Sequence, residues 1–446
     1  MSVLKEFQEV KILNFMKSNV KYLVVFVLAL VLLVVFVSGG LVGGESYFNA
    51  RYDGSGYDSL SFGGRSVDFP VGFGILFGGS EFTLKFFPVL FGFLSLIVFL
   101  FILKELKIED KVIFASLCVL VLSPSFIYLF GVGSSLCFGV FLFLLSLLFL
   151  LKGWDLLSGL GFLTLVFVNL FFAYFSVLLL FLLYFKKRKK VYLLWSVLVF
   201  GVVYLLYGFD FGFIRSVDYK LFLSDFGGEY GLGLFSLIAA IFGFFVLWRK
   251  KYSNLFTYMS IFCVFVLSLY FYEAIFILNF FICFFAGLGI VGLFKRQWES
   301  DLIKQFTLLI LILGILFSGL SYVSRSGELY PNSGYLEGLD ALGDGVVFSS
   351  ISNGHLISYN GNKNYWDENV YGMDISLLEE DAYTLLHSTS EEETISIIDK
   401  YDISYIYLDS FDIEELGDGG FLLLVRRADS SFEEIFNNGI VAVYEV

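Results

Sequence analysis

The sequence is poor in the residues from which disulfides, metal sites and catalytic relays are built. Its 446 residues include only four cysteines and two histidines, His355 and His387. The cysteines lie in apolar stretches, where free thiols usually pack as small hydrophobic groups, so we expect them to be buried and unpaired. The scarcity of histidine argues against a multi-histidine metal site or a Ser-His-Asp relay. His355 follows Asn353-Gly354 and is expected in a turn, with a surface or capping role.

Charged residues are also scarce, at 16% of the chain, whereas 58% of the residues are apolar and 20% are aromatic. The mean hydropathy of +0.83 is typical of an integral membrane protein. The net charge of −13 divides into two regions of opposite sign. Residues 322–446 hold 24 acids and five bases, whereas residues 1–321 hold 18 acids and 24 bases. We therefore expect a membrane domain over 1–321 and a soluble domain over 322–446, long enough to have its own small core.

Long apolar runs predict about eleven membrane helices, because a span needs about 17–25 apolar residues. The first run is too long for the apolar region of a cleaved signal peptide, so we interpret it as a membrane helix. The expected spans cover residues 22–42, 86–103, 112–130, 135–151, 156–168, 170–185, 191–207, 232–248, 255–271, 275–294 and 306–321.

Lysine and arginine predict the orientation, because cytoplasmic loops are enriched in both. Dividing 156–185 into two short helices that turn near 169–173 keeps the basic cluster 186–190 on the same side as the basic N-terminal segment. We expect a multi-pass protein of the cell membrane, with its N-terminus in the cytoplasm and residues 322–446 outside. The outer face then carries a long first loop over 43–85 and a second loop near 208–231.

The acidic tail alternates strand-like and helix-like runs. Residues 346–349 and 405–408 are typical of buried strands, and Ser390-Glu391-Glu392-Glu393 is a capping box that predicts a helix ending near Lys400. Residues 435–446, with Asn438-Gly439 at the turn, predict a hairpin. The tail is therefore expected to be a small α/β domain.

The first outer loop is the longest in the membrane part and the richest in acids, arginines and aromatics. Nucleotide sugars are cytoplasmic, so a transferase on the outer face needs a donor delivered through the membrane, such as a polyprenyl-phosphate-linked sugar. Phosphate is already a good leaving group, so the site needs a base for the acceptor hydroxyl, and cations or a metal for the phosphate. Glu45 fits the base, because partial desolvation at the membrane interface raises a carboxylate pKa. An ordinary solvated carboxylate is the alternative interpretation.

Further candidates lie in both outer loops. Asp58 is the second catalytic candidate, and with Arg65 it brackets a Gly-Gly turn; the two orient the loop or a substrate, or form an intraloop salt bridge. The candidates for binding the lipid phosphate or the acceptor are Arg51, Arg65, Arg215 and Lys220. Arg51 also suits a membrane-interface anchor. Glu273 lies between two apolar runs, as a turn residue or as an acid inside the membrane.

These segments resemble the GT-C class of polytopic membrane glycosyltransferases, especially archaeal members related to protein mannosyltransferases and oligosaccharyltransferases. The resemblance rests on Gly44-Glu45-Ser46-Tyr47-Phe48-Asn49-Ala50-Arg51 and Phe69-Pro70-Val71-Gly72 in the first loop, and on Phe348-Ser349-Ser350-Ile351-Ser352-Asn353-Gly354-His355 in the tail. It implies an acidic residue in the first outer loop, a polyprenyl- or dolichyl-phosphate-linked donor and an outer soluble domain. The implied partners are this donor, membrane lipid and a protein, lipid or glycan acceptor, with no nucleic acid.

One turn departs from the pattern of this class. Many members carry a second acid between the third and fourth spans, where this chain has Gly131-Val132-Gly133-Ser134-Ser135. No metal site is assigned, although a divalent cation remains an option. Either Glu45 works alone, or Asp58 or Asp218 replaces the missing acid, or the chain is not an active enzyme. The sequence thus favours an inverting glycosyltransferase with a single carboxylate base over a non-catalytic scaffold or glycan-binding protein of the same fold, and over a transporter.

Overall fold

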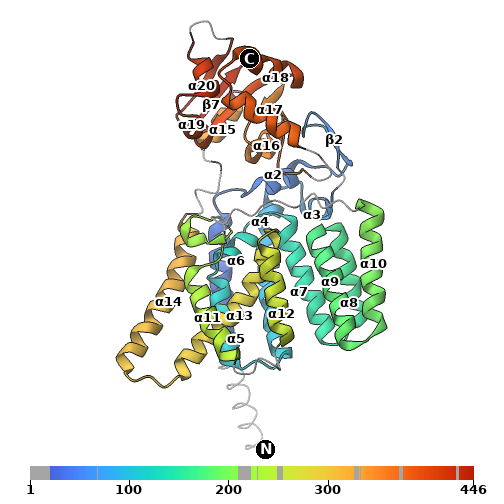
Figure 1. The fold of residues 1–446 in the computed structure, drawn as a ribbon, viewed down its shortest axis with the longest axis vertical. Coiled ribbons are helices and arrows are strands. Elements are labelled where there is room, and N and C mark those ends of the chain that lie inside the picture. Colours follow the sequence, from blue (N-terminus) through green and yellow to red (C-terminus); the bar gives the residue numbers. More distant parts are fainter. Residues whose placement is uncertain are drawn as a thin grey trace, which may run out of the picture.

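The computed structural model describes residues 21–67, 69–208, 222–228, 230–248, 255–325, 331, 333–370, 375–427 and 431–446. It consists of a layer of helices that run side by side, with a smaller α/β unit stacked on one end of this layer (Figure 1). The first outer loop lies between the two parts.

Each predicted apolar stretch coincides with helical structure. By length and composition, α4, α10, α13 and α14 can each cross a membrane among the described helices. The helices of this layer are Lys21–Val37, α4 (Glu81–Glu105), α5 (Asp110–Val121), α6 (Pro124–Leu129), α7 (Ser135–Leu151), α8 (Asp155–Thr164), α9 (Leu170–Lys187), α10 (Lys190–Tyr207), α11 (Leu234–Trp248), α12 (Leu255–Ser268), α13 (Glu273–Lys295) and α14 (Asp301–Ser324).

Small residues bring two of these helices into backbone contact. A Cβ at Gly243 of α11 would lie 1.9 Å from the Phe285 carbonyl oxygen, and one at Gly289 of α13 would lie 2.0 Å from that of Ala239. Close packing through small residues is a common way for helices to associate in lipid, where apolar side chains gain little from burial.

The helix break expected near 169–173 is present but lies a few residues earlier, at 165–169, because α9 already begins at Leu170. A short 3-10 helix, η1 (Leu165–Phe167), follows α8, and Asn169 caps the start of α9 by accepting the Phe172 N–H at 3.2 Å. Asparagine is a favoured N-cap because its side-chain oxygen satisfies an N–H that the helix leaves without a partner. The expected burial of the cysteines is confirmed for Cys137 and Cys283, but Cys118 is half-buried and Cys263 is exposed.

The first outer loop contains short regular elements. It begins with α2 (Gly44–Arg51), continues through the antiparallel pair β1 (Tyr57–Asp58) and β2 (Arg65–Ser66), and ends with α3 (Gly72–Phe77). The rings of Phe48, Tyr52 and Phe69 pack together inside it. The loop therefore has its own small apolar cluster.

The C-terminal unit, over residues 331–446, is built on a five-stranded sheet of order β4-β3-β5-β7-β6. β3, β4 and β5 are parallel, and β7 pairs antiparallel with β5 and β6. The predicted strands, the helix after Ser390 and the hairpin turning at Asn438-Gly439 are all present. The elements are α15 (Ser333–Asp340), β3 (Val346–Phe348), α16 (Gly354–Tyr359), β4 (Lys363–Asn364), α17 (Ser376–His387), α18 (Glu391–Tyr401), β5 (Ile403–Asp409), α19 (Ser410–Leu416), α20 (Gly420–Val425), β6 (Glu433–Asn437) and β7 (Val441–Glu445).

The two faces of this sheet pack against different partners. One face, including Phe348 and Ile406, packs with α17, α18 and α20 in one buried cluster. The opposite face, including Val347 and Tyr407, packs with α15 and α16 in another. Tyr47 of α2 packs against this second cluster, so the first outer loop is joined to the core of the C-terminal unit.

Candidate functional site

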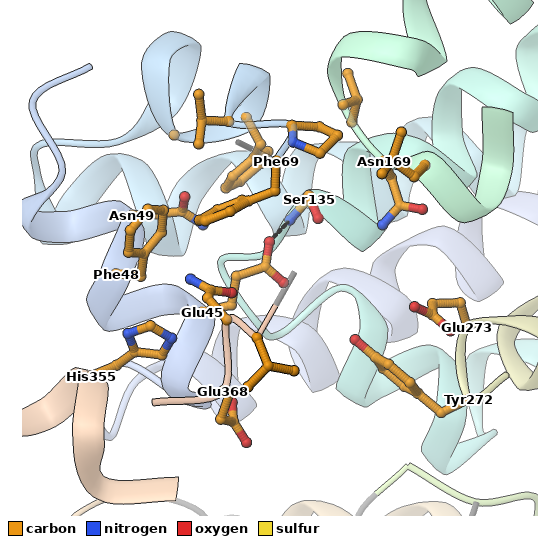
Figure 2. Close-up of a pocket in the computed structure, with 18 residues that line it drawn as sticks. Glu45, Phe48, Asn49, Phe69, Ser135, Asn169, Tyr272, Glu273, His355 and Glu368 are labelled. Atoms are coloured by element: carbon orange, nitrogen blue, oxygen red, sulfur yellow. Dashed lines mark hydrogen bonds between the residues drawn. The ribbon is translucent and has the colours of Figure 1, made fainter. Parts of the chain in front are cut away.

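A pocket lies where the helical layer, the first outer loop and the C-terminal unit meet (Figure 2). We call it the junction pocket. It holds three carboxylates and, among the described residues, no lysine or arginine. Its lining residues are Glu45, Phe48, Asn49, Phe69, Pro70, Val71, Phe73, Gly74, Ser135, Val168, Asn169, Leu170, Tyr272, Glu273, His355, Glu368, Asn369 and Val370.

Glu45 occupies the first turn of α2 and points into the junction pocket (Figure 2). A carboxylate is favourable there because the helix N-terminus carries partial positive charge. Burial raises the pKa of Glu45 above its ordinary value, while hydrogen bonds from Ser135 and Asn49 act in the opposite direction. The net effect brings the carboxylate closer to the range in which it exchanges protons near neutral pH.

The turn 131–135, which carries no acid, contacts Glu45 directly. The Ser135 N–H, at the start of α7, donates to Glu45 Oε1 at 2.7 Å. Two more hydrogen bonds fix α2 on this turn: the Gly133 N–H donates to Ser46 Oγ at 2.9 Å, and Asn49 Nδ2 donates to the Gly133 carbonyl at 3.0 Å. The turn therefore supplies a donor to Glu45 where related proteins were expected to supply a carboxylate.

Asp58 and Arg51 bind each other. The Arg51 guanidinium makes two hydrogen bonds of 2.6 Å to the Asp58 carboxylate, and their side chains are only 10% and 2% exposed. The intraloop salt bridge of Asp58 is thus made with Arg51, not with Arg65. Neither Asp58 nor Arg51 lines the junction pocket.

Arg65 reaches the C-terminal unit instead. Its guanidinium lies 3.9 Å from the Asp367 carboxylate, and it donates to the Asn369 carbonyl. Ser61 Oγ also donates to Asp367. Burial alone would raise the pKa of Asp367, but the neighbouring His355 and Arg65 and the hydrogen bonds hold it below its ordinary value.

Main-chain contacts strengthen this connection. The Asn364 N–H donates to the Leu60 carbonyl at 2.8 Å, and its side-chain oxygen accepts the Phe62 N–H at 2.9 Å. The first outer loop and the C-terminal unit are therefore held together by a network of buried polar contacts.

His355 is not in an exposed turn, so the expectation of a surface or capping role is wrong. It lies in α16 with 1% of its surface exposed, its ring centroid 5.5 Å from that of Phe48. Burial lowers its pKa to about 4, so the imidazole is neutral at pH 7.

Three further acidic or amide residues line the pocket. Glu273, a candidate from the sequence as a turn residue or as an acid inside the membrane, begins α13 and is 1% exposed in the pocket wall. Sequence reasoning missed the other two, Glu368 and Asn369. Glu368 and Asn369 follow β4 in the polar run Asn364-Tyr365-Trp366-Asp367-Glu368-Asn369. Such a polar run after a strand was the available signal, because loops beyond strand ends often carry functional residues.

Arg215, Lys220 and Asp218 lie outside the described residues. Within the described ranges, no three histidine, cysteine, aspartate or glutamate side chains are close enough to hold a metal ion. The described lining therefore does not fit a metal site of its own.

Solved structures resemble this fold over most of the chain. The archaeal oligosaccharyltransferase AglB from Archaeoglobus fulgidus, in complex with an inhibitory peptide and a dolichol-phosphate, has a TM-score of 0.65 at 11% identity, over 90% of this chain and 70% of AglB. ArnT from Cupriavidus metallidurans in the apo state has a TM-score of 0.53 at 13% identity, over 96% of this chain and 98% of ArnT. The arabinofuranosyltransferase AftD from Mycobacteria has a TM-score of 0.51 at 13% identity, over 96% of this chain and 41% of AftD.

No protein-family model matches the sequence, and no curated protein matches it. At identities this low, the structural similarity establishes the arrangement of the chain and not its substrates. The three proteins are all GT-C glycosyltransferases, and this chain has a GT-C-like fold.

Proposed function

We propose that the protein is a membrane glycosyltransferase that moves a sugar from a polyprenyl-phosphate-linked donor to an acceptor on the extracytoplasmic face, with inversion at the anomeric carbon. The observation that carries the proposal is Glu45, a carboxylate with a raised pKa in the junction pocket. The fold supports the reaction class, since its structural neighbours are glycosyltransferases and one of them is in complex with a dolichol-phosphate.

In the proposed reaction, Glu45 takes the proton of the acceptor hydroxyl. The hydroxyl oxygen forms a bond to the anomeric carbon while the bond from that carbon to the phosphate oxygen breaks, and the polyprenyl phosphate leaves with the electron pair. The Ser135 N–H donates to Oε1 and so helps to orient the carboxylate toward the acceptor. A raised pKa improves the base, because proton transfer is most efficient when the pKa lies near the working pH.

The cationic candidates have different proposed roles. Arg51 and Arg65 hold the first outer loop through Asp58 and Asp367, so we assign them to positioning rather than to direct phosphate contact. Arg215 and Lys220 of the second outer loop remain the proposed contacts for the lipid phosphate. Asp58 is retained as a second catalytic candidate only if Glu45 proves dispensable.

The proposed location is the cell membrane, with a cytoplasmic N-terminus and an outer soluble domain over 322–446. The charge distribution supports this orientation. Figure 1 shows α2 and the C-terminal unit at the same end of the helical layer, and Glu45 of α2 lines the junction pocket, so the pocket and the C-terminal unit are expected to face the same compartment. The acceptor is a protein, lipid or glycan.

A second candidate function is a non-catalytic, glycan-binding or scaffold role for the same fold. The structural neighbours do not favour it, because they are glycosyltransferases.

The test is sugar transfer by the purified protein in liposomes with radiolabelled polyprenyl-phosphate sugars. We expect Glu45→Gln to lower transfer by about a hundredfold or more, the typical contribution of a general base. Glu81→Gln, which changes an exposed acid of the same loop, is the matched control and should retain activity.

Because Glu45 has a raised pKa in the folded protein, its ionisation costs stability as the pH rises, so Glu45→Gln should unfold at an equal or higher temperature at pH 7.

Full transfer by the Glu45→Gln protein would move the base elsewhere, with Asp58 and Asp218 next in line. Donor binding without transfer by any variant, including the wild type, would favour the non-catalytic role.

A further inference from the structure

Two residues in the wall of the junction pocket have buried polar atoms without a hydrogen-bond partner among the described residues. These atoms are both ring nitrogens of His355 and Nδ2 of Asn369, and the two residues are 1% and 9% exposed. Buried polar groups are nearly always hydrogen-bonded in native proteins, so exceptions that line a pocket indicate a ligand as the missing partner. Both residues come from the C-terminal unit.

The side chain of His355 is held in a fixed position. Its ring packs against Phe48, and its Nδ1 lies 3.6 Å from Asp367 Oδ2. A Cβ at Gly44 would lie 3.1 Å from His355 Cδ2, so the ring edge that carries Cδ2 and Nε2 lies against the start of α2, beside Glu45. Figure 2 shows His355 and Glu45 on the same side of the pocket, with Tyr272 and Glu273 across from them.

Asn369 is fixed through its main chain. Its N–H donates to Asp367 Oδ1 at 2.9 Å, and its carbonyl accepts from Arg65. Asp367 therefore lies beside both residues: Oδ1 accepts the Asn369 N–H, and Oδ2 faces Nδ1 of the His355 imidazole. A binding group that is already in position loses little conformational entropy when a ligand arrives.

The chemistry of the two atoms is complementary. The ionised Asp367 carboxylate can only accept hydrogen bonds, so it favours the proton of the neutral imidazole on Nδ1 and leaves Nε2 as an acceptor. Asn369 Nδ2 is a donor. A hydroxyl group both donates and accepts, and therefore satisfies both atoms. A phosphate oxygen only accepts, so it would leave Nε2 without a partner, and it would be repelled by the carboxylates of the pocket.

We propose that His355 and Asn369 bind hydroxyl groups of the sugar in the junction pocket and thereby help to determine which sugar is accepted. The inference rests on the proposed function of this pocket and adds the residues that distinguish one sugar from another. The hydroxyls belong to the sugar of the lipid-linked donor or to a glycan acceptor, and the two arms of the experiment separate these sources.

The experiment measures equilibrium binding to the full chain in lipid nanodiscs. The donor probes are polyprenyl phosphate carrying mannose, glucose or galactose, with bare polyprenyl phosphate as the reference, and the acceptor probes are the methyl glycosides of the same hexoses. We expect His355→Phe and Asn369→Leu each to lower the affinity for the preferred hexose-bearing probe by about five- to tenfold, the usual effect of losing one hydrogen bond. The affinity for bare polyprenyl phosphate should not change. His355→Gln returns an acceptor and should recover part of the loss.

Asn362→Leu is the matched control. Asn362 is also 9% exposed in the C-terminal unit, but its Nδ2 donates to the Gly343 carbonyl at 2.6 Å and it does not line the junction pocket. A loss confined to the donor probes assigns the hydroxyls to the donor, and a loss confined to the methyl glycosides assigns them to the acceptor.

Unchanged hexose binding in both folded variants would overturn the inference. So would an equal loss in Asn362→Leu, or no discrimination by the wild type between hexose-bearing and bare probes. Its failure is distinguishable from that of the proposed function. If Glu45→Gln loses transfer but hexose binding is unchanged in the His355 and Asn369 variants, only the inference about sugar binding is wrong. If hexose binding is weakened in the His355 and Asn369 variants but Glu45→Gln retains full transfer, only the assignment of the base is wrong.

Discussion

Glu45 acquires its acid–base character from parts of the chain that are far from it in sequence. A carboxylate on an exposed helix would titrate near its ordinary value, whereas here burial raises the pKa and a hydrogen bond from a residue 90 positions later opposes that rise. Sequence could suggest Glu45, because the acid, the preceding apolar helix and the aromatic loop are local features. The Ser135 contact depends on how α2 and α7 pack, which no local pattern encodes.

Replacing Ser135 with proline tests this contact. The substitution removes the N–H that donates to Glu45, and it suits the site because Ser135 is the first residue of α7 and Ser134 already has an extended backbone, with φ −120° and ψ 161°. The pKa of Glu45 should rise further. Since the base must be ionised, the acidic limb of the pH profile of kcat/KM should move to higher pH. Ser135→Ala keeps the N–H and should move the limb less; a limb that stays in place or moves to lower pH in Ser135→Pro would contradict the assignment.

At the scale of elements, two buried ion pairs determine how the first outer loop is held. The Arg51–Asp58 pair closes the segment between α2 and β1, and the Arg65–Asp367 contact attaches β2 to the C-terminal unit. Breaking one member of a buried pair is costly, because the remaining charge is left without a partner in a poorly solvated site.

A double-substitution series separates a structural role of Asp58 from a catalytic one. We expect Asp58→Leu alone to destabilise the protein by about 3–5 kcal/mol, because it leaves the Arg51 charge buried, and Arg51→Met/Asp58→Leu to recover much of that loss. Thermal unfolding and sugar transfer are measured together. Transfer that returns with stability in the double variant assigns Asp58 to structure. A stable double variant without transfer would instead make Asp58 a reacting group.

The same elements explain what could be predicted and what could not. Helices and strands could be predicted because apolar runs, the Asn438-Gly439 turn and the Ser390 cap are local sequence signals. The partners of Arg51 and Arg65 were not, since several acids in the loop and the tail were equally available by sequence. His355 looked like a turn residue because Asn353-Gly354 precedes it, but the fold buries it against Phe48, more than 300 positions earlier.

At the scale of the whole molecule, the distribution of lysine and arginine among the connections between helices predicts the orientation in the membrane. The basic connections of the helical layer are expected in the cytoplasm and the acidic C-terminal unit outside.

Cysteine labelling in intact cells tests this orientation. In a background with the four native cysteines replaced by alanine, Asp418→Cys should react with a membrane-impermeant maleimide, because the Asp418 side chain is 91% exposed on the C-terminal unit. Lys111→Cys, at an exposed position in the first turn of α5, should react only after the cells are permeabilised. The reverse pattern would place the junction pocket in the cytoplasm and exclude an extracytoplasmic reaction.

The strand order of the C-terminal unit has a consequence for biosynthesis. β7 is made after the other described strands, yet it lies between β5 and β6, and its Val441 and Val443 complete the cluster that supports α16 and hence His355. While the ribosome is still producing residues before 441, that cluster is incomplete and the wall over Glu45 lacks its support. In a nascent chain, therefore, the part of the pocket wall that comes from the C-terminal unit is not yet in place over Glu45. Competence for transfer would come late in synthesis, after β7 has been inserted into the sheet.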